Sequence, residues 1–497
     1  MSISWKLRSK TAWIALLSVA MWVAMPLLNA QEGTPAQQTQ PPPQTSAPPQ
    51  SAPLEKKPDA STPQEGANGR EQATVTVEKK ISPEEARELL NSVDEILQFV
   101  SKETGLPIKH SVKRQLATRE EVVKYLEDRM KEDKDTERLE RAATSLKKFG
   151  LLPPDFNLRP YLLELLKEQV AGFYDARTQT VYLLDWVEAD AQRPVLAHEL
   201  THALQDQSFG MEKWAEIKKN PKGDTESAEI DEERSARQAV LEGQAMVVLI
   251  DYTLEPLGKT VMDSPDLVNA MKAGMSSDGA SPIYARSPLF LREALVFPYT
   301  WGLDFVRQVM KSRGRDGAFA GTLKNPPVDT RQLMEPSTYL AAEKLGQLPI
   351  PDFKGILGKD LEVDDTGGIG EFDLYVMLKQ WIGTKAADDR ARTWRGGYYL
   401  TARDKKNKNA PVSLIYTSKW PDANDALEFS RLYVQGLQKR YKSVRPGEHD
   451  GTGSMWMTDD GPVELEIRGD TMVVTEGFER EKAKALRELA FGKAKTD

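Results

Sequence analysis

The stretch Val195-Leu196-Ala197-His198-Glu199-Leu200-Thr201-His202-Ala203-Leu204-Gln205-Asp206-Gln207 contains two histidines four residues apart, with a glutamate directly after the first. On an α-helix, residues four apart differ by about 40° around the axis, so His198 and His202 lie on one face, one turn apart. Glu199 lies about 100° from His198, close enough to hold a metal-bound water without itself being a ligand. The stretch therefore predicts a helix that carries two zinc ligands and a general base for hydrolysis.

The surroundings of the motif favour a helix. Pro194 suits a first helical turn, apolar residues flank the histidines, and no residue from 195 to 207 breaks a helix. The alternative is a surface helix with unrelated histidines, although the whole chain has only four. Because the chain has no cysteine, a metal site must use histidines and carboxylates.

A third ligand is expected from a long helical pattern over residues 227–254, which is charged in its first half and apolar over 239–252. Glu242 lies in the apolar half, where an unpaired charge is costly and a metal ion would compensate it. We therefore predict Glu242 as the third ligand, with Glu233 as the main alternative and Glu232 and Asp231 behind it. In the purely structural interpretation, Glu242 pairs with Arg234 or Arg237. Gly243 would let this helix approach another one closely.

Other residues are candidates for supporting roles. Two β-rich runs, 171–174 and 181–184, predict a hairpin directly before the motif helix, which either pairs with a substrate backbone or only packs against the helix. Gln205 and Asp206 fall about 20° from His198 and Glu199 around the helix, so either can orient a ligand or simply lie on the surface. The candidates for oxyanion stabilisation are Tyr174, Tyr252 and Tyr299, whereas His449 and His110 are given no role.

The motif also supports a resemblance. His198-Glu199-Leu200-Thr201-His202 with Glu242-Gly243-Gln244-Ala245 resembles the glutamate-zincin (gluzincin) branch of the zincin metallopeptidases, and the stretches 172–175 and 203–207 resemble exported, uncharacterised bacterial members. The resemblance implies zinc bound by two histidines and a glutamate, in a helix-rich domain with a small sheet beside the metal helix. Asn325-Pro326-Pro327 and Gly370-Glu371-Phe372 are also similar, without an assigned role. The chain departs from the thermolysin pattern in spacing, since Glu242 lies 40 residues after His202.

The N-terminal residues predict export. Residues 1–30 combine Lys6, Arg8 and Lys10 with an apolar run, which indicates a signal peptide; an uncleaved membrane anchor is the alternative. Residues 31–70 are rich in Pro, Gln and Ser and predict a disordered spacer. Residues 1–30 contain no acidic residue, so their removal takes the formal charge from -8 to -11, which disfavours nucleic-acid binding. The zero cysteine count also excludes a disulfide scaffold.

The remaining residues predict an α+β protein with a helix-rich, zincin-like metallopeptidase domain over 71–350 and a smaller α+β domain over 351–497. In the first domain we expect helices from Ser82, over 118–131 and 135–149, two helices over 287–313 broken at Phe297-Pro298 and capped by Gly314, and a loop over 325–339. In the second we expect strands at 398–402, 412–417, 454–457, 463–467 and 471–475 and helices at 422–441 and 479–491.

The functional hypothesis is a periplasmic or secreted zinc peptidase that acts on a peptide or protein, with Glu199 as general base. It requires no stable membrane insertion unless the N-terminal segment stays uncleaved. The alternatives are a non-catalytic zincin-fold factor for envelope assembly or binding, and an amidase for cell-wall peptides. Oligomeric state and substrate preference stay open.

Overall fold

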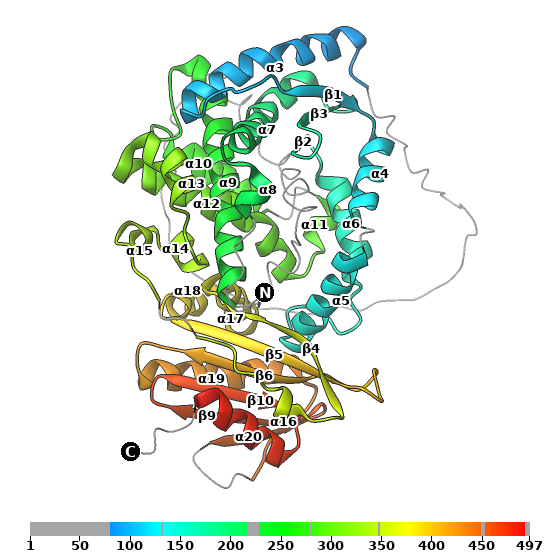
Figure 1. Ribbon diagram of the computed structural model, residues 1–497, viewed down its shortest axis with the longest axis vertical. Coiled ribbons are helices and arrows are strands. Elements are labelled where there is room, and N and C mark those ends of the chain that lie inside the picture. Colours follow the sequence, from blue (N-terminus) through cyan, green and yellow to red (C-terminus); the bar gives the residue numbers. More distant parts are fainter. Residues whose placement is uncertain are drawn as a thin grey trace, which may run out of the picture. The chain divides into compact units, whose positions relative to one another are not determined.

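The computed structural model describes residues 80–130, 133–215, 228–277, 281–345, 348–448 and 453–492. The predicted signal segment, the predicted spacer and His449 lie outside these ranges. The fold is mixed α+β, as predicted, with a helix-rich part followed by a seven-stranded sheet and its helices (Figure 1). None of the described helices is both long enough and apolar enough to cross a membrane.

The helix-rich part begins where the sequence predicts it. Ser82 accepts a hydrogen bond from the Glu85 backbone, and the Glu85 carboxylate accepts one from the Ser82 backbone, so a capping box starts the first helix. The helices of this part are α3 (Pro83–Thr104), α4 (Arg119–Met130), α5 (Asp133–Lys148), α6 (Leu158–Gln169), α7 (Ala189–Phe209), α8 (Met211–Ala215), α9 (Ala228–Leu254), η2 (Glu255–Leu257), α10 (Pro265–Met275), α11 (Pro282–Ala285), α12 (Leu289–Asp316), η3 (Gly317–Gly321), α13 (Thr322–Lys324), α14 (Thr330–Met334) and α15 (Pro336–Leu340).

A three-stranded sheet packs beside α7. Its strands are β1 (Lys113–Ala117), β2 (Phe173–Asp175) and β3 (Thr180–Leu184), in the order β1-β3-β2. The predicted hairpin is confirmed, since β2 and β3 pair antiparallel, whereas β1 was not predicted and pairs parallel with β3. Strand β2 therefore lies at one edge of this sheet, and both β2 and β3 contact α7.

The start of α7 was predicted wrongly. The helix begins at Ala189, so Pro194 lies inside it rather than in its first turn. Gln192 explains the earlier start, because its buried carboxamide bonds both backbone groups of Leu184 and the carbonyl of Val187. These bonds fix the first turn of α7 to the end of β3, and a proline at the sixth helical position is tolerated there.

Helices α9 and α12 cross with their backbones in contact. A Cβ atom added to Gly243 would lie 2.2 Å from the Gly302 backbone, and one added to Gly302 would lie 2.1 Å from the Ala239 carbonyl oxygen. The close approach predicted from Gly243 is therefore confirmed. The predicted break at Phe297-Pro298 is wrong, because α12 runs through Pro298. Its helical conformation is interrupted instead at Gly314, where φ is 70°.

The loop predicted over 325–339 is also wrong in part. Two short helices, α14 and α15, occupy most of it. The side chain of Asp329 caps α14 by accepting a hydrogen bond from the Gln332 backbone, and Pro336 opens α15. Aspartate and proline are common in loops, which is why this stretch was predicted as a loop. Both residue types also favour the first positions of helices, as Asp329 and Pro336 do here.

The seven-stranded sheet is antiparallel throughout. Its strands are β4 (Leu361–Gly368), β5 (Gly396–Asp404), β6 (Ser413–Lys419), β7 (Val444–Pro446), β8 (Ser454–Thr458), β9 (Gly461–Arg468) and β10 (Thr471–Glu476), in the order β4-β5-β6-β10-β9-β8-β7. The associated helices are α16 (Lys354–Leu357), α17 (Glu371–Ile382), α18 (Thr384–Ala391), α19 (Ala423–Arg440) and α20 (Arg480–Phe491). The five strands and two helices predicted after residue 397 are all present; β4, β7, α16, α17 and α18 were not predicted.

Buried polar contacts join the sheet to α5. Ser145 donates a hydrogen bond to Asp365 of β4. Further along α5, the Lys148 ammonium lies 3.7 Å from Glu476 of β10, and the Lys148 carbonyl accepts a hydrogen bond from Arg440 of α19. Arg440 also forms a buried ion pair with Glu476 at 2.7 Å. One hydrophobic cluster includes residues of both the helix-rich part and the sheet, so the two parts share a core.

Candidate metal centre

Helices α7 and α9 bring three ligand atoms together. His198 Nε2 lies 3.2 Å from Glu242 Oε2 and 3.2 Å from His202 Nε2, and His202 Nε2 lies 3.4 Å from Glu242 Oε2. All three residues are almost completely buried. They form the one group of histidine, aspartate and glutamate side chains in the described residues whose geometry can hold a metal ion.

The spacing of these atoms fits a zinc ion. Nitrogen and oxygen ligands lie about 2.0–2.2 Å from zinc, so two corners of a zinc tetrahedron are about 3.3–3.6 Å apart. The separations of 3.2, 3.2 and 3.4 Å are close to the edge lengths of such a tetrahedron. The donor set of two imidazoles and a carboxylate is also one that catalytic zinc sites use, with the fourth corner left for water.

The charges of the three residues are coupled. Burial alone would raise the pKa of Glu242, but the positive charge of His202 and hydrogen bonds from both histidines lower it to about 2. Burial opposes the charge on His202 as well, yet the neighbouring Glu242 raises its pKa to about 9. Burial lowers the pKa of His198. Without a metal ion, one proton thus compensates the buried carboxylate, and a divalent cation would supply the same compensation.

Glu199 lies between the ligands and the edge strand β2. It is 1% exposed, and its Oε2 accepts a hydrogen bond of 2.8 Å from the Tyr174 backbone N–H. Its Oε1 has no hydrogen-bond partner among the described residues. Burial raises the pKa of Glu199 to about 8, with Glu242 adding to the effect and His202 and the Tyr174 amide opposing it. The raised pKa means that the carboxylate, once ionised, has a high proton affinity, which suits a general base.

The alternative third ligands face other partners. Glu233 pairs with Arg237, one turn along α9. Glu232 accepts hydrogen bonds from the backbone and the hydroxyl of Thr330 in α14. Neither of them, nor Asp231, belongs to the group of described residues that could hold a metal ion. Since Glu242 contacts both histidines, the interpretation in which it pairs with Arg234 or Arg237 does not describe its surroundings.

Only one of the two polar residues after the motif supports a ligand. Gln205 Oε1 lies 2.8 Å from His202 Nδ1, so its carbonyl can accept the imidazole proton. Asp206 instead accepts hydrogen bonds from the Tyr174 hydroxyl and the Met211 backbone. Asp206 therefore holds β2 and the end of α7 rather than a ligand.

The three candidate tyrosines lie in different places. The Tyr299 ring of α12 faces the His198 ring, with centroids 6.2 Å apart and planes inclined by 28°. Tyr174 uses its hydroxyl on Asp206, and Tyr252 packs edge-on against Phe99. Of the three, Tyr299 thus lies against a candidate ligand. His110 has an exposed side chain whose Nδ1 lies 3.2 Å from the Ser111 carbonyl, and its backbone N–H and carbonyl both hydrogen-bond the Gln207 side chain of α7.

A family model for a domain of unknown function (DUF8575) matches residues 360–487. The match runs from the start of β4 into α20, so it covers the seven-stranded sheet and not α7 or α9. Comparison with curated proteins and with solved structures finds no match for the chain. The similarity therefore concerns the C-terminal sheet, while the candidate metal centre is argued from its own geometry.

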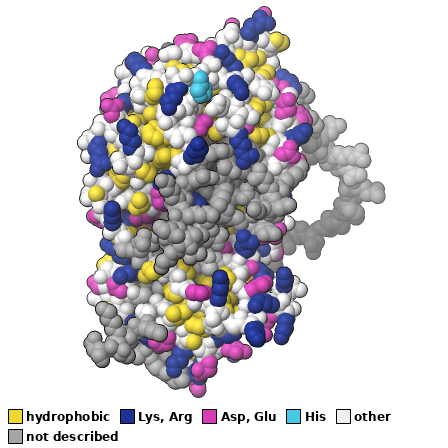
Figure 2. Space-filling view, viewed as in Figure 1, with side chains coloured by type: hydrophobic (Ala, Val, Ile, Leu, Met, Phe, Trp, Pro, Cys, Tyr) yellow, Lys and Arg dark blue, Asp and Glu magenta, His cyan; other side chains and the backbone are white. Residues whose placement is uncertain are grey.

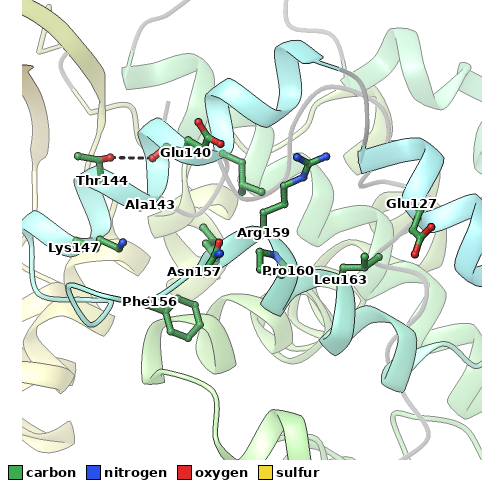
Figure 3. A pocket seen from close by; sticks show the side chains of 12 residues that line it. Glu127, Glu140, Ala143, Thr144, Lys147, Phe156, Asn157, Arg159, Pro160 and Leu163 are labelled. Carbon is green, nitrogen blue, oxygen red and sulfur yellow. Dashed lines mark hydrogen bonds between the residues drawn. The ribbon is translucent and has the colours of Figure 1, made fainter. Parts of the chain in front are cut away.

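A separate cavity of about 700 Å³ lies among α4, α5 and α6 (Figure 3). None of the candidate ligands lines it; its walls are Glu127, Leu139, Glu140, Ala143, Thr144, Lys147, Phe156, Asn157, Leu158, Arg159, Pro160 and Leu163.

On the molecular face in Figure 2, acidic, basic and hydrophobic side chains all occur across the described surface. The candidate ligands are buried, so surface chemistry alone would not reveal them.

One element of the site was not visible in the sequence pattern. The backbone N–H of Tyr174 donates a hydrogen bond to Glu199. Every residue except proline has such an N–H, so the residue type at 174 does not reveal the contact. The signal that pointed towards it was the hairpin directly before the motif helix. Such a hairpin places an edge strand beside the first turns of that helix.

Proposed function

We propose that this chain is an exported zinc-dependent peptidase, in which His198, His202 and Glu242 hold zinc and Glu199 is the general base. The observation that carries the proposal is the triangle of two Nε2 atoms and one Oε2 atom with sides of 3.2, 3.2 and 3.4 Å. Glu199 is the residue next to His198, and it too is buried at this place.

The protein's residues divide the work of hydrolysis. Bound zinc would acidify a water molecule and polarise a carbonyl group. Glu199 takes the proton of the attacking water on its Oε1, the oxygen that no described residue bonds, and passes it to the leaving amine. The Tyr174 N–H holds the other oxygen, Oε2, and so fixes the orientation of the carboxylate.

A peptide substrate fits the edge strand. Strand β2 lies at the edge of its sheet and contacts both α7 and Glu199. An extended peptide that pairs with such an edge brings its carbonyl groups along the strand. We therefore propose a peptide or protein as the substrate, aligned by β2 next to Glu199. Tyr299, whose ring faces the His198 ring, is our candidate for the oxyanion donor.

The same features support a zincin-like, glutamate-zincin assignment. The metal-motif helix α7 has a small sheet beside it and a glutamate from the following long helix α9 opposite it. We also propose a periplasmic or secreted location, on the basis of the signal-like residues 1–30.

The test combines metal analysis with activity. We expect about one zinc per chain in the purified protein and cleavage of members of a broad peptide library. Glu199→Gln should keep the zinc and lower hydrolysis by at least about 100-fold, because the base is removed while the ligands remain. The matched control is Glu233→Gln, which changes a glutamate of α9 that pairs with Arg237 and should alter neither property.

Four results would count against the proposal or favour an alternative. Unchanged hydrolysis in Glu199→Gln would contradict the mechanism. Zinc lost in Glu233→Ala but kept in Glu242→Ala would contradict the ligand assignment. A zinc-bound protein that cleaves no peptide but retains an envelope protein would favour the binding factor, and cleavage confined to cell-wall peptides would favour the amidase.

A further inference from the structure

Gln244 lies two residues after Glu242 in the apolar half of α9, and the proposed mechanism gives it no task. Its side chain is completely buried and fully hydrogen-bonded. The Nε2 group shares its two protons among the carbonyls of Ala318 and Phe319, at 2.9 and 3.1 Å, and the Thr322 hydroxyl, at 2.9 Å. Its Oε1 accepts a hydrogen bond of 2.9 Å from Gln205.

These contacts leave the Gln244 carboxamide one orientation. A carboxamide has donors on one side and acceptors on the other. The Thr322 hydroxyl donates its own proton to the Ala318 and Phe319 carbonyls, so towards Gln244 it can only accept. Three acceptors therefore face the amide nitrogen of Gln244, and its oxygen must point at Gln205.

The orientation of Gln205 follows in the same way. Its Nε2 donates to Gln244 Oε1 at 2.9 Å and to the Leu241 carbonyl at 3.2 Å. Its Oε1 is thereby turned towards His202 Nδ1 at 2.8 Å and can only accept from it. The Nδ1 atom of His202 must then carry a proton, which leaves the lone pair of Nε2 for a metal ion.

The acceptors at the far end belong to one short segment. Ala318 and Phe319 lie in η3, the π-helical turn that follows α12, and Thr322 comes directly after it. Single π turns are rare in proteins, and many of those that occur lie near functional sites. Here the turn presents two carbonyls and a hydroxyl to one amide group of α9.

We propose that Gln244 is a positioning residue, which fixes the His202 tautomer through Gln205 and so lets the turn Gly317–Gly321 set the zinc affinity. The inference rests on the proposed zinc site. It assigns a task to a residue that touches neither the metal ligands nor a substrate directly.

The decisive variant is Gln244→Glu. It keeps the shape of the side chain but places a carboxylate oxygen against three acceptors, so the chain of oriented hydrogen bonds is broken. We expect zinc affinity, measured by competition with a chelator, to fall by about 10- to 100-fold. We also expect the visible spectrum of the cobalt-substituted protein to change, since the spectrum reports the arrangement of the ligands.

Gln192→Glu is the matched control. Gln192 is also a buried glutamine, and its carboxamide bonds the backbone of Leu184 and Val187 at the start of α7, away from His202. A change there should lower the urea midpoint of unfolding without changing zinc affinity or the cobalt spectrum. Thr322→Val removes one acceptor and should weaken zinc binding a few-fold, whereas Thr322→Ser keeps the hydroxyl and should restore it.

The outcomes separate this inference from the function. If the unmodified protein binds zinc and Gln244→Glu binds it equally well, or if Gln192→Glu loses as much affinity, the positioning role is overturned and the zinc site stands. If Gln244→Glu does not fold, equal zinc affinities in Thr322→Val and Thr322→Ser overturn the role. If the unmodified protein binds no zinc, the proposed function fails and this inference fails with it.

Discussion

Glu242 in the candidate metal centre and Glu476 in the seven-stranded sheet are both buried carboxylates, and the pKa of each is lowered to about 2. Their partners differ. Glu476 faces the Arg440 guanidinium, the Lys148 ammonium and the hydroxyls of Tyr433 and Tyr441. Glu242 faces two imidazoles.

The difference lies in whether the partner can release its proton. A guanidinium stays protonated in proteins, so the Arg440–Glu476 pair is permanent and serves stability. An imidazole releases its proton near neutral pH and then offers a lone pair to a metal ion. Burial opposes the charge of both carboxylates, and cationic partners lower both pKa values, so the chemistry of the partner indicates whether the pair is structural or can bind a ligand.

The strongest test of the difference between Glu242 and Glu476 is to neutralise each carboxylate in turn. Glu242→Gln removes the charged ligand, so zinc per purified chain should fall from about one to near zero. Glu476→Gln should leave zinc binding unchanged and lower the free energy of unfolding. Both are measured by metal analysis and urea unfolding on the same preparations; zinc lost equally in both variants would contradict the distinction.

A second prediction removes the permanent cation. Arg440→Met leaves Glu476 buried without its guanidinium, which should lower the free energy of unfolding by about 3–5 kcal/mol. Arg431→Met is the control, because Arg431 pairs with Glu428 at the surface, where an ion pair contributes about 0–1 kcal/mol. Urea denaturation measures both, and equal losses in the two variants would show that burial does not distinguish them.

A third prediction uses acid. Burial opposes the charge of Glu476, but Arg440 and Lys148 lower its folded-state pKa from 4.5 to about 2. The ionised carboxylate thus stabilises the fold fully above about pH 4.5, and this stabilisation of about 3 kcal/mol is lost as the pH falls towards 2. The check is the difference in unfolding free energy between the unmodified protein and Glu476→Gln, which should shrink over this range. A difference that stays constant with pH would contradict the assignment.

The sequence predicted most of the elements that carry periodic or capping signals. The Ser82 capping box, the motif helix, the long helix with Glu242 and the strands after residue 397 all depend on local residue patterns. Sequence-based prediction failed where contacts with residues of another element determine the local structure. The start of α7 depends on Gln192 bonding to the end of β3, and β1 becomes a strand by pairing with β3.

The candidate site followed the same division. His198, His202 and Glu199 were predicted from spacing within one helix, and Glu242 from its apolar surroundings. The contact of the Tyr174 backbone with Glu199 and the stack of Tyr299 on His198 involve other elements, so no local pattern could distinguish them. For Gln205 the sequence left two possibilities, orienting a ligand or lying on the surface. Its angular position on the helix does not show which residues of other elements lie opposite it.

The crossing of α9 and α12 has a consequence for recognising related chains. Glycine is required at both 243 and 302, since a Cβ at either position would collide with the opposite backbone. Glu242 is adjacent to one of these glycines, so its placement opposite α7 depends on the same close helix packing. A sequence pattern that joins the two histidines and Glu199 to Glu242-Gly243 and to a glycine about 60 residues downstream would be more selective than the histidine motif alone. Substitutions at the two glycines should therefore be tolerated only when the helices separate, which would shift α9 and Glu242 with it.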